Sequence, residues 1–209
     1  MDKLIIIDGN SLANRAFYGV PLLTNSKGVY TNAVYGFINM MLGFFKKQEP
    51  MYAAVAFDVS KKVFRHEKYA DYKGTRKGMP EELAEQMPIL KEILRSMNIA
   101  ILEKEGYEAD DIIGTVVKKA EENNIASIIL TGDKDSLQLI SELTEVYLTK
   151  KGISQTQKMD LAALAEEYGL NPAQICDLKG LMGDSSDNIP GVVGVGEKTA
   201  LKLLREYHD

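Results

Sequence analysis

The stretch Leu4-Ile5-Ile6-Ile7-Asp8-Gly9-Asn10 joins four consecutive apolar residues to an acid and a turn. Four apolar residues without polar alternation indicate a strand that is buried on both faces. Similar apolar runs recur at 52–57, 99–102 and 126–130. The chain therefore begins with the pattern of a sheet that is covered on both sides.

Amphipathic helical patterns separate these apolar runs. The first presents one apolar face, formed by Val34, Phe37, Ile38, Met41, Phe44 and Phe45. A second covers 83–97 behind Pro80, and Pro88 predicts a kink or break near Met87. A third begins at about 108 and reaches 120. This alternation predicts an α/β fold with a mostly parallel central sheet and helices on both faces.

The pattern changes in the last quarter of the chain. After about residue 155 the strands stop, and short helical patterns follow at 161–168, 172–181 and 197–207, joined by glycine-rich turns. We expect a core over 1–155 and a small helical subdomain over 156–209.

Composition narrows the class of protein. The 209 residues carry 25 Lys and Arg against 30 Asp and Glu, a net charge of -5. No apolar run approaches the roughly 20 residues that span a bilayer, so we expect no membrane segment. The one cysteine, Cys176, can form neither an internal disulfide nor a cysteine zinc site, which indicates a cytoplasmic protein. No helix-stop signal follows Arg205, so we expect the chain to belong to a longer protein.

Nine acids follow predicted strands or lie near helix starts: Asp8, Asp58, Glu108, Asp110, Asp111, Asp133, Asp135, Asp184 and Asp187. Taken singly, such an acid is most often a turn residue or a helix N-cap. Because the carboxyl ends of parallel strands share one edge of a sheet, at least four should converge there. Carboxylates gathered in one cleft repel, which predicts bound cations, and oxygen ligands without His or Cys favour Mg²⁺ or Mn²⁺. Two such ions ~3.5–4 Å apart suit phosphoryl chemistry.

The segment 61–77 reverses the charge balance. It holds seven basic residues against two acidic ones, a local net charge of +5, with Phe64, Tyr69 and Tyr72 interleaved. An isolated run of this kind is more often a solvated face, but this one directly follows Asp58. Cations bind phosphates and aromatic rings stack on unpaired bases, so the segment predicts contact with single-stranded nucleic acid.

A glycine-rich stretch covers 189–198 and contains Gly191, Gly194 and Gly196. No strand precedes it, which excludes a dinucleotide-binding motif. Between two helices it predicts a hairpin whose N–H groups and following helix N-terminus bind phosphate. A purely structural turn stays open as the alternative.

Seven motifs in chain order resemble the 5′ nuclease domains of bacterial DNA polymerase I, a flap endonuclease group within the PIN-like fold. They are Ile5-Ile6-Ile7-Asp8-Gly9-Asn10, Phe57-Asp58, Phe64-Arg65, Tyr72-Lys73-Gly74-Thr75-Arg76, Tyr107-Glu108-Ala109-Asp110-Asp111, Gly132-Asp133-Lys134-Asp135 and Gly183-Asp184-Ser185-Ser186-Asp187-Asn188-Ile189-Pro190-Gly191. The resemblance covers essentially the whole chain. It implies a nuclease core followed by a helix-three-turn-helix element that binds duplex DNA.

The same resemblance implies the roles of individual residues. All nine acids would hold two or more metal ions, and the segment 59–80 would form a helical arch or clamp. Lys73 and Arg76 match positions that reach the scissile phosphate. The implied DNA contacts are Arg15, Arg65, Tyr72, Gly191, Gly194, Gly196 and Lys198. The glycine hairpin often holds a monovalent cation in the family. Relatives continue beyond the hairpin, so we expect this helical subdomain to be truncated.

The resemblance implies a Mg²⁺-dependent 5′–3′ exonuclease and structure-specific flap endonuclease that removes primers in DNA replication and repair. Its partner would be DNA with a 5′ flap or 5′ end, bound as a monomer without sequence preference; whether a polymerase domain is attached stays open. Two alternatives stay open: a PIN-type ribonuclease and a non-catalytic DNA-binding module. Without the nine acids, 21 acids face 25 bases, so the net charge of -5 does not exclude nucleic acid.

Overall fold

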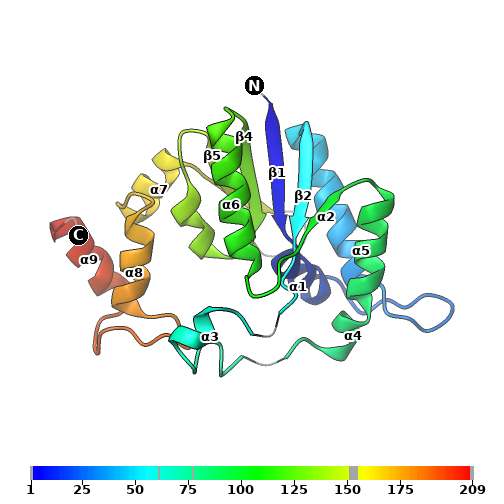
Figure 1. Ribbon diagram of the computed structural model, residues 1–209, viewed down its shortest axis with the longest axis horizontal. Helices are drawn as coiled ribbons and strands as arrows, with labels where there is room; N and C mark the ends of the chain where they lie inside the picture. Colours follow the sequence, from blue (N-terminus) through cyan, green and yellow to red (C-terminus); the bar gives the residue numbers. More distant parts are fainter. Residues whose placement is uncertain (1, 61, 77, 151–154, 208–209) are drawn as a thin grey trace.

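A six-stranded sheet runs through the centre of this computed structural model, which describes residues 2–60, 62–76, 78–150 and 155–207 (Figure 1). The strands are β1 (Lys3–Asp8), β2 (Tyr52–Ala56), β3 (Ala100–Leu102), β4 (Ala126–Thr131), β5 (Thr144–Thr149) and β6 (Thr156–Met159). Their order is β3-β2-β1-β4-β5-β6, and only β6 pairs antiparallel to its neighbour. The predicted α/β class with a mostly parallel sheet is confirmed.

Helices cover both faces of the sheet. They are α1 (Gly9–Gly19), α2 (Asn32–Gln48), α3 (Arg65–Lys68), α4 (Glu81–Ala84), α5 (Gln86–Ser96), α6 (Ala109–Glu122), α7 (Leu161–Tyr168), α8 (Gln174–Met182) and α9 (Glu197–Tyr207), with a 3₁₀ helix η1 (Lys134–Leu139). The first core cluster joins α1, α2 and α5 to one face. The second joins α6 to the other face and continues into α7, α8 and α9. None of the described helices is apolar over a length that would cross a membrane.

Strand β1 shows why its sequence has no polar alternation. Ile5 and Ile7 belong to the core cluster beneath α1 and α2, whereas Ile6 belongs to the cluster beneath α6. All three side chains have 0% exposure, so both faces of the strand need apolar residues. The strand then ends on an acid because its last residue, Asp8, is also the N-cap of α1. Burial of β1 thus fixes where the first acid of the site lies.

The turn after β1 is closely packed. A Cβ built on Gly9 would lie 2.3 Å from the Cε1 atom of Phe57, which follows β2. Only glycine therefore lets α1 begin directly against the neighbouring strand. The carboxyl ends of β1, β2 and β4 come together at the lower end of the molecule in Figure 1, where α3 and α4 also lie.

Two strands escaped the sequence pattern. The expectation that strands stop after about residue 155 is wrong, because β6 pairs with β5 at the edge of the sheet. A division after residue 155 leaves this strand on the C-terminal side. Residues 156–158 are polar, and within β6 only Met159 is buried, so the segment shows neither an apolar run nor a clear alternation. Strand β5 does alternate between buried and half-buried positions, but Thr144 and Thr149 fill two of the buried ones, so its sequence shows no apolar run.

Two helical expectations also differ in detail. The break in the second helical pattern falls at Glu85, between α4 and α5, slightly before the expected place. Pro88 lies in the first turn of α5, where its missing N–H leaves no intrahelical bond unmade. Within the described part of 59–80, only the four residues of α3 are α-helical, so the expected arch is mostly loop.

Candidate metal centre

Three strand ends bring Asp8, Asp58 and Asp133 to one edge of the sheet. Asp8 is 6% exposed and its carboxylate is fixed by two donors: the Ser11 N–H at 3.0 Å and the Thr131 hydroxyl at 2.8 Å. The cap of α1 and the neighbouring strand thus hold one carboxylate from both sides. The sequence analysis did not identify Thr131 as part of this arrangement.

Asp58 and Asp133 likewise follow a strand end and accept a hydrogen bond from an N–H group at the start of a helix. The Oδ1 atom of Asp58 accepts a 2.7 Å hydrogen bond from the N–H of Ala109, the first residue of α6. The N–H of Asp58 donates to Asn10 Oδ1 at 3.1 Å, a second contact that the sequence analysis missed. Asp133 caps η1 by accepting from the N–H of Asp135 at 2.9 Å. These acids therefore accept hydrogen bonds at helix starts and also converge at one edge of the sheet.

Four acids, which we call the inner acids, form no ion pair with any described lysine or arginine: Asp8, Asp58, Asp110 and Asp133. Burial raises the pKa of Asp110 to about 8, with a further contribution from the charges of the other three. Burial also raises the pKa of Asp8 to about 6, although the hydrogen bonds from Ser11 and Thr131 lower it in part. The inner acids therefore carry more negative charge than their surroundings stabilise.

The remaining five, which we call the paired acids, face cations of the chain itself: Glu108, Asp111, Asp135, Asp184 and Asp187. Arg65 donates to both carboxylate oxygens of Asp111 at 2.8 Å and lies 3.2 Å from Glu108 Oε2. Burial raises the pKa of Asp111, but the hydrogen bonds from Arg65 outweigh it and bring the pKa below its ordinary value. The Nζ atom of Lys73 lies 2.5 Å from Glu108 Oε1.

The loop after α3 is held against the acids by Tyr72 and its neighbours. The Tyr72 hydroxyl lies 2.8 Å from Glu108 Oε2 and 2.9 Å from Asp187 Oδ2. The N–H of Lys73, at a φ of +54°, donates to the Asp187 carbonyl at 2.9 Å. Arg76 Nη2 is 3.5 Å from Asp187 Oδ1. Tyr72 is 5% exposed, so its ring can stack on a base only if this loop moves.

Lys179 neutralises the last two paired acids. Its Nζ atom lies 2.7 Å from Asp135 Oδ1 and 2.7 Å from Asp184 Oδ2. Although burial raises the pKa of Asp184, the hydrogen bonds from Lys179 and Ser186 lower it to about 2. The sequence analysis missed Lys179; its position five residues before Asp184, on the preceding helix, was the available signal.

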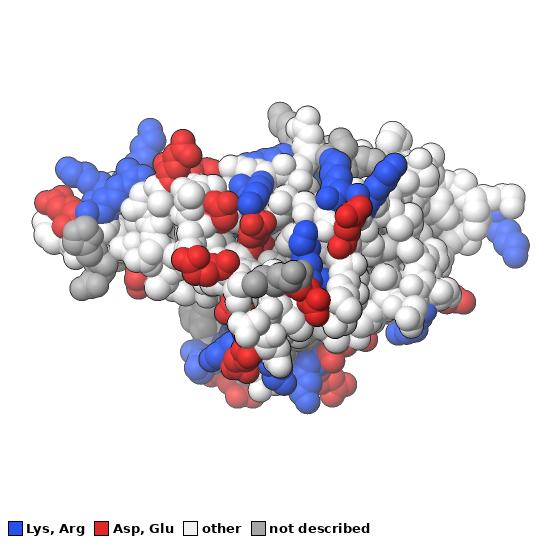
Figure 2. Space-filling view, turned by 90° about the horizontal axis from the view of Figure 1, so that it is seen from above, with Lys and Arg blue, Asp and Glu red and all other residues white. Residues whose placement is uncertain are grey.

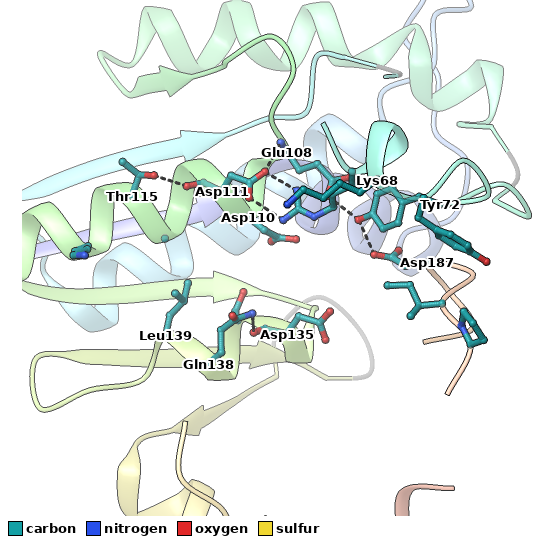
Figure 3. A pocket seen from close by; sticks show the side chains of 17 residues that line it. Lys68, Tyr72, Glu108, Asp110, Asp111, Thr115, Asp135, Gln138, Leu139 and Asp187 are labelled. Atoms are coloured by element: carbon teal, nitrogen blue, oxygen red, sulfur yellow. Dashed lines mark hydrogen bonds and ion pairs between the residues drawn. The ribbon is translucent and has the colours of Figure 1, made fainter. Parts of the chain in front are cut away.

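The acids line two cavities that meet at Glu108, Asp110 and Asp187. One, of about 770 Å³, extends toward α1 and is lined by all four inner acids. The other, of about 790 Å³, extends between α6 and η1, and Figure 3 shows Asp110 and Asp135 on opposite sides of it. At the opposite end of the molecule, Figure 2 shows lysines, arginines and acids interspersed. In that view no comparable concentration of acids appears.

The inner acids fit a hard divalent cation in their chemistry. They supply only carboxylate oxygens, and they carry uncompensated negative charge that a divalent ion would balance. Among the described residues, however, no three acidic, histidine or cysteine side chains are already close enough to coordinate one ion. Ion binding must therefore draw these carboxylates closer together against their repulsion.

The glycine hairpin serves packing as well as any ligand. A Cβ on Gly191 would lie 2.3 Å from the backbone carbon of Met182, and one on Gly183 would lie 2.4 Å from the nitrogen of Gly191. Gly194 needs its φ of +80°, whereas a Cβ on Gly196 would meet open space. Gly191 is thus required by backbone packing, which favours the structural alternative at this one position.

The other expected DNA contacts lie apart from the acids. Arg15, on α1, donates to the carbonyl of Thr149 at 3.1 Å and does not line either acid-lined cavity. Lys198 is exposed in the first turn of α9. Lys61 and Lys77, two members of the predicted basic segment, fall outside the described residues.

Two family models match the chain in tandem. Residues 3–169 match the 5′–3′ exonuclease N-terminal resolvase-like domain, and residues 170–209 match the 5′–3′ exonuclease C-terminal SAM fold. The chain belongs to the 5′–3′ exonuclease family. This membership agrees with the resemblance that the sequence motifs carried.

The curated relatives are longer proteins. DNA polymerase I of Bacillus caldotenax is 53% identical over 205 residues, which cover 98% of this chain and 23% of the relative. DNA polymerase I of Bacillus subtilis (strain 168) is 52% identical over the same share of each chain. The chain thus spans about a quarter of the length of the curated relatives it matches.

Solved structures of bacteriophage T5 proteins share the fold. A T5 5′-exonuclease with bound divalent metal ions (zinc) aligns with a TM-score of 0.80 and 26% identity, covering 99% of this chain and 76% of that one. A T5 flap endonuclease in a pseudo-enzyme-product complex with DNA and metal ions aligns with a TM-score of 0.78 and 26% identity over the same shares.

We predict that Asp110→Asn stabilises the EDTA-treated protein increasingly as pH rises. A carboxyl group whose pKa is raised in the folded state keeps a proton that the unfolded chain has already released. The ionisable Asp110 therefore lowers the free energy of unfolding increasingly from about pH 4 to about pH 8, and asparagine removes this effect. The gain in free energy of unfolding, measured with urea, should grow by roughly 1–2 kcal/mol between pH 5 and pH 8. Asp177→Asn, at an exposed position, is the control; a gain that does not grow with pH would contradict the prediction.

The hairpin gives a second prediction. Gly191→Ala should lower the free energy of unfolding by about 1–3 kcal/mol, because the added Cβ overlaps the backbone of Met182. Gly196→Ala adds a Cβ into open space and should leave stability unchanged. Urea denaturation measures both. Equal losses would show that backbone packing does not explain the glycine at 191.

Proposed function

We propose that this chain is a divalent-metal-dependent 5′–3′ exonuclease and flap endonuclease acting on DNA, with Mg²⁺ as its ion and Mn²⁺ as a substitute. The observation that carries the proposal is the convergence of four carboxylates without a described cation partner, next to Arg65 on α3 and to Lys73 and Arg76 on the loop after it. Family membership and relatives crystallised with metal ions or DNA support it. The relatives also support a polymerase domain adjoining this nuclease in the whole protein.

The proposed ligands divide according to their present contacts. The inner acids have no described lysine or arginine partner to release, whereas the paired acids must first release their cationic partners. When bound, two ions would activate a water and stabilise the leaving oxygen of a phosphodiester. The chain's own residues bind and orient the DNA around that chemistry.

Lys73 and Arg76 are placed to hold the scissile phosphate. Both lie at the rim of the acid-lined cavity toward α1, and Arg76 is half exposed. A phosphate that enters this cavity offers each of them an anion in exchange for the carboxylates of Glu108 and Asp187. Interactions that strengthen as charge develops on the phosphate then favour the transition state over the bound substrate.

The hairpin and the start of α9 supply the duplex contacts. Val193 is 99% exposed at the hairpin, just before the N-terminus of α9, where backbone N–H groups can bind phosphate. Contacts of this kind hold backbone phosphates without reading sequence, so binding should weaken steeply with salt.

Cleavage of a 5′-flap duplex in Mg²⁺ tests the function. Asp110→Asn should reduce cleavage at least ~10²-fold, because it removes one inner acid of the proposed site. The control Asp177→Asn should cleave like the wild type, and EDTA should stop both. Preferential cleavage of single-stranded RNA would favour the PIN-type ribonuclease instead. Binding of flap DNA without hydrolysis would favour the non-catalytic module.

The role of Lys73 has its own test. Lys73→Met should lower kcat at saturating flap DNA by about 10²-fold while changing KM less, because the contact strengthens in the transition state. The matched control is Lys91→Met. Lys91 Nζ lies 2.6 Å from Glu103 Oε1, and Lys91 lines neither of the two acid-lined cavities. A rise in KM with unchanged kcat would reduce Lys73 to a binding contact.

A further inference from the structure

Lys179 occupies a bridging position between two of the proposed metal ligands. Its ammonium group lies 2.7 Å from one oxygen of Asp135 and 2.7 Å from one oxygen of Asp184, with the side chain 31% exposed. The lysine comes from α8, Asp135 from η1 and Asp184 from the loop after α8. Three different segments are therefore joined through one cation.

Of the two carboxylates that Lys179 joins, Asp184 has further donors, whereas the ion-pair partner of Asp135 among the described residues is Lys179. Asp184 Oδ1 accepts from the Ser186 N–H at 2.8 Å and from the Ser186 hydroxyl at 2.6 Å, which leaves Oδ2 to the lysine. Asp135, Lys179, Asp184 and Asp187 all line a cavity of about 290 Å³. An ammonium group thus stands where a divalent ion shared by Asp135 and Asp184 would have to enter.

The inner acids present the opposite case. They make no ion pair with a described lysine or arginine, so a first ion entering there displaces no such cation. An ion entering between Asp135 and Asp184 meets the positive charge of Lys179 at close range. At such distances two like charges cannot share a pair of carboxylates without a large electrostatic penalty.

We propose that Lys179 is a resident counter-ion that competes with a divalent cation for Asp135 and Asp184. It is a positioning residue in the unloaded site, where it holds these two carboxylates together. It also sets the concentration of divalent ion at which the second position fills. The inference rests on the proposed metal site and adds to it the group that controls loading.

A lysine of similar geometry outside the cleft provides a matched control. The Nζ atom of Lys158 lies 2.7 Å from Glu145 Oε1 and 3.3 Å from Asp160 Oδ2, at the β5–β6 edge of the sheet. Lys158→Met therefore removes a two-carboxylate bridge without touching the proposed ligands. Lys179→Arg retains the charge at the site of interest and completes the set.

The test is a titration of the EDTA-treated protein with Mn²⁺ in the absence of DNA, followed by the free-Mn²⁺ electron paramagnetic resonance signal. The wild type should show a tighter and a weaker class of site. Lys179→Met should tighten the weaker class by roughly five- to tenfold, because one competing charge is gone, and leave the tighter class unchanged. Lys179→Arg and Lys158→Met should both titrate like the wild type.

The outcomes separate this inference from the proposed function. If the wild type binds no Mn²⁺, the metal site itself is wrong. If the wild type binds Mn²⁺ but Lys179→Met binds it equally or more weakly, Lys179 is a structural brace and the competition is refuted. Should Lys179→Met fail to fold by circular dichroism, Lys179→Gln retains a hydrogen-bonding side chain without the charge, and the same tightening is expected.

Discussion

Carboxylates gathered at one edge of a parallel sheet repel each other, and the arrangement of the basic side chains around the site depends on this repulsion. The strands β1, β2 and β4 carry apolar residues on both faces because both faces are covered, so their acids appear only where each strand ends. Parallel pairing then gathers Asp8, Asp58 and Asp133 at the same edge. The fold that buries the core thereby creates a concentration of negative charge.

The chain balances this charge unevenly. Arg65, Lys73 and Lys179 neutralise paired acids through short contacts, while the inner acids have no partner among the described lysines and arginines. Burial and mutual repulsion raise the pKa of Asp110 to about 8. A cation that binds the inner acids displaces no described lysine or arginine, whereas a cation that binds the paired acids must displace one. The same exchange would release Lys73 and Arg76 to bind phosphate.

The sequence was sufficient for the sheet interior and for the acids, because both follow from simple local rules. Apolar runs without alternation predicted β1 to β4, and an acid at a strand end predicted convergence. Strand β5 lies between β4 and β6, but polar residues such as Thr144 fill buried positions of it, so its sequence shows no apolar run. The edge strand β6 has only one buried residue, Met159, so its sequence shows no strand pattern either. Lys179 was missed because its meaning depends on a contact across three segments. The pairing of Arg65 with Asp111 likewise could not be predicted, because a run of basic residues is equally compatible with a solvent-exposed face.

We expect the inner acids to bind a divalent ion before the paired acids do. Crystals of the protein grown in EDTA and soaked in limiting Mn²⁺ test it through the anomalous scattering of manganese. We expect the first anomalous peak among Asp8, Asp58, Asp110 and Asp133, with Lys179 still bridging Asp135 and Asp184. A first peak between Asp135 and Asp184, or no peak at the strand ends, would contradict it.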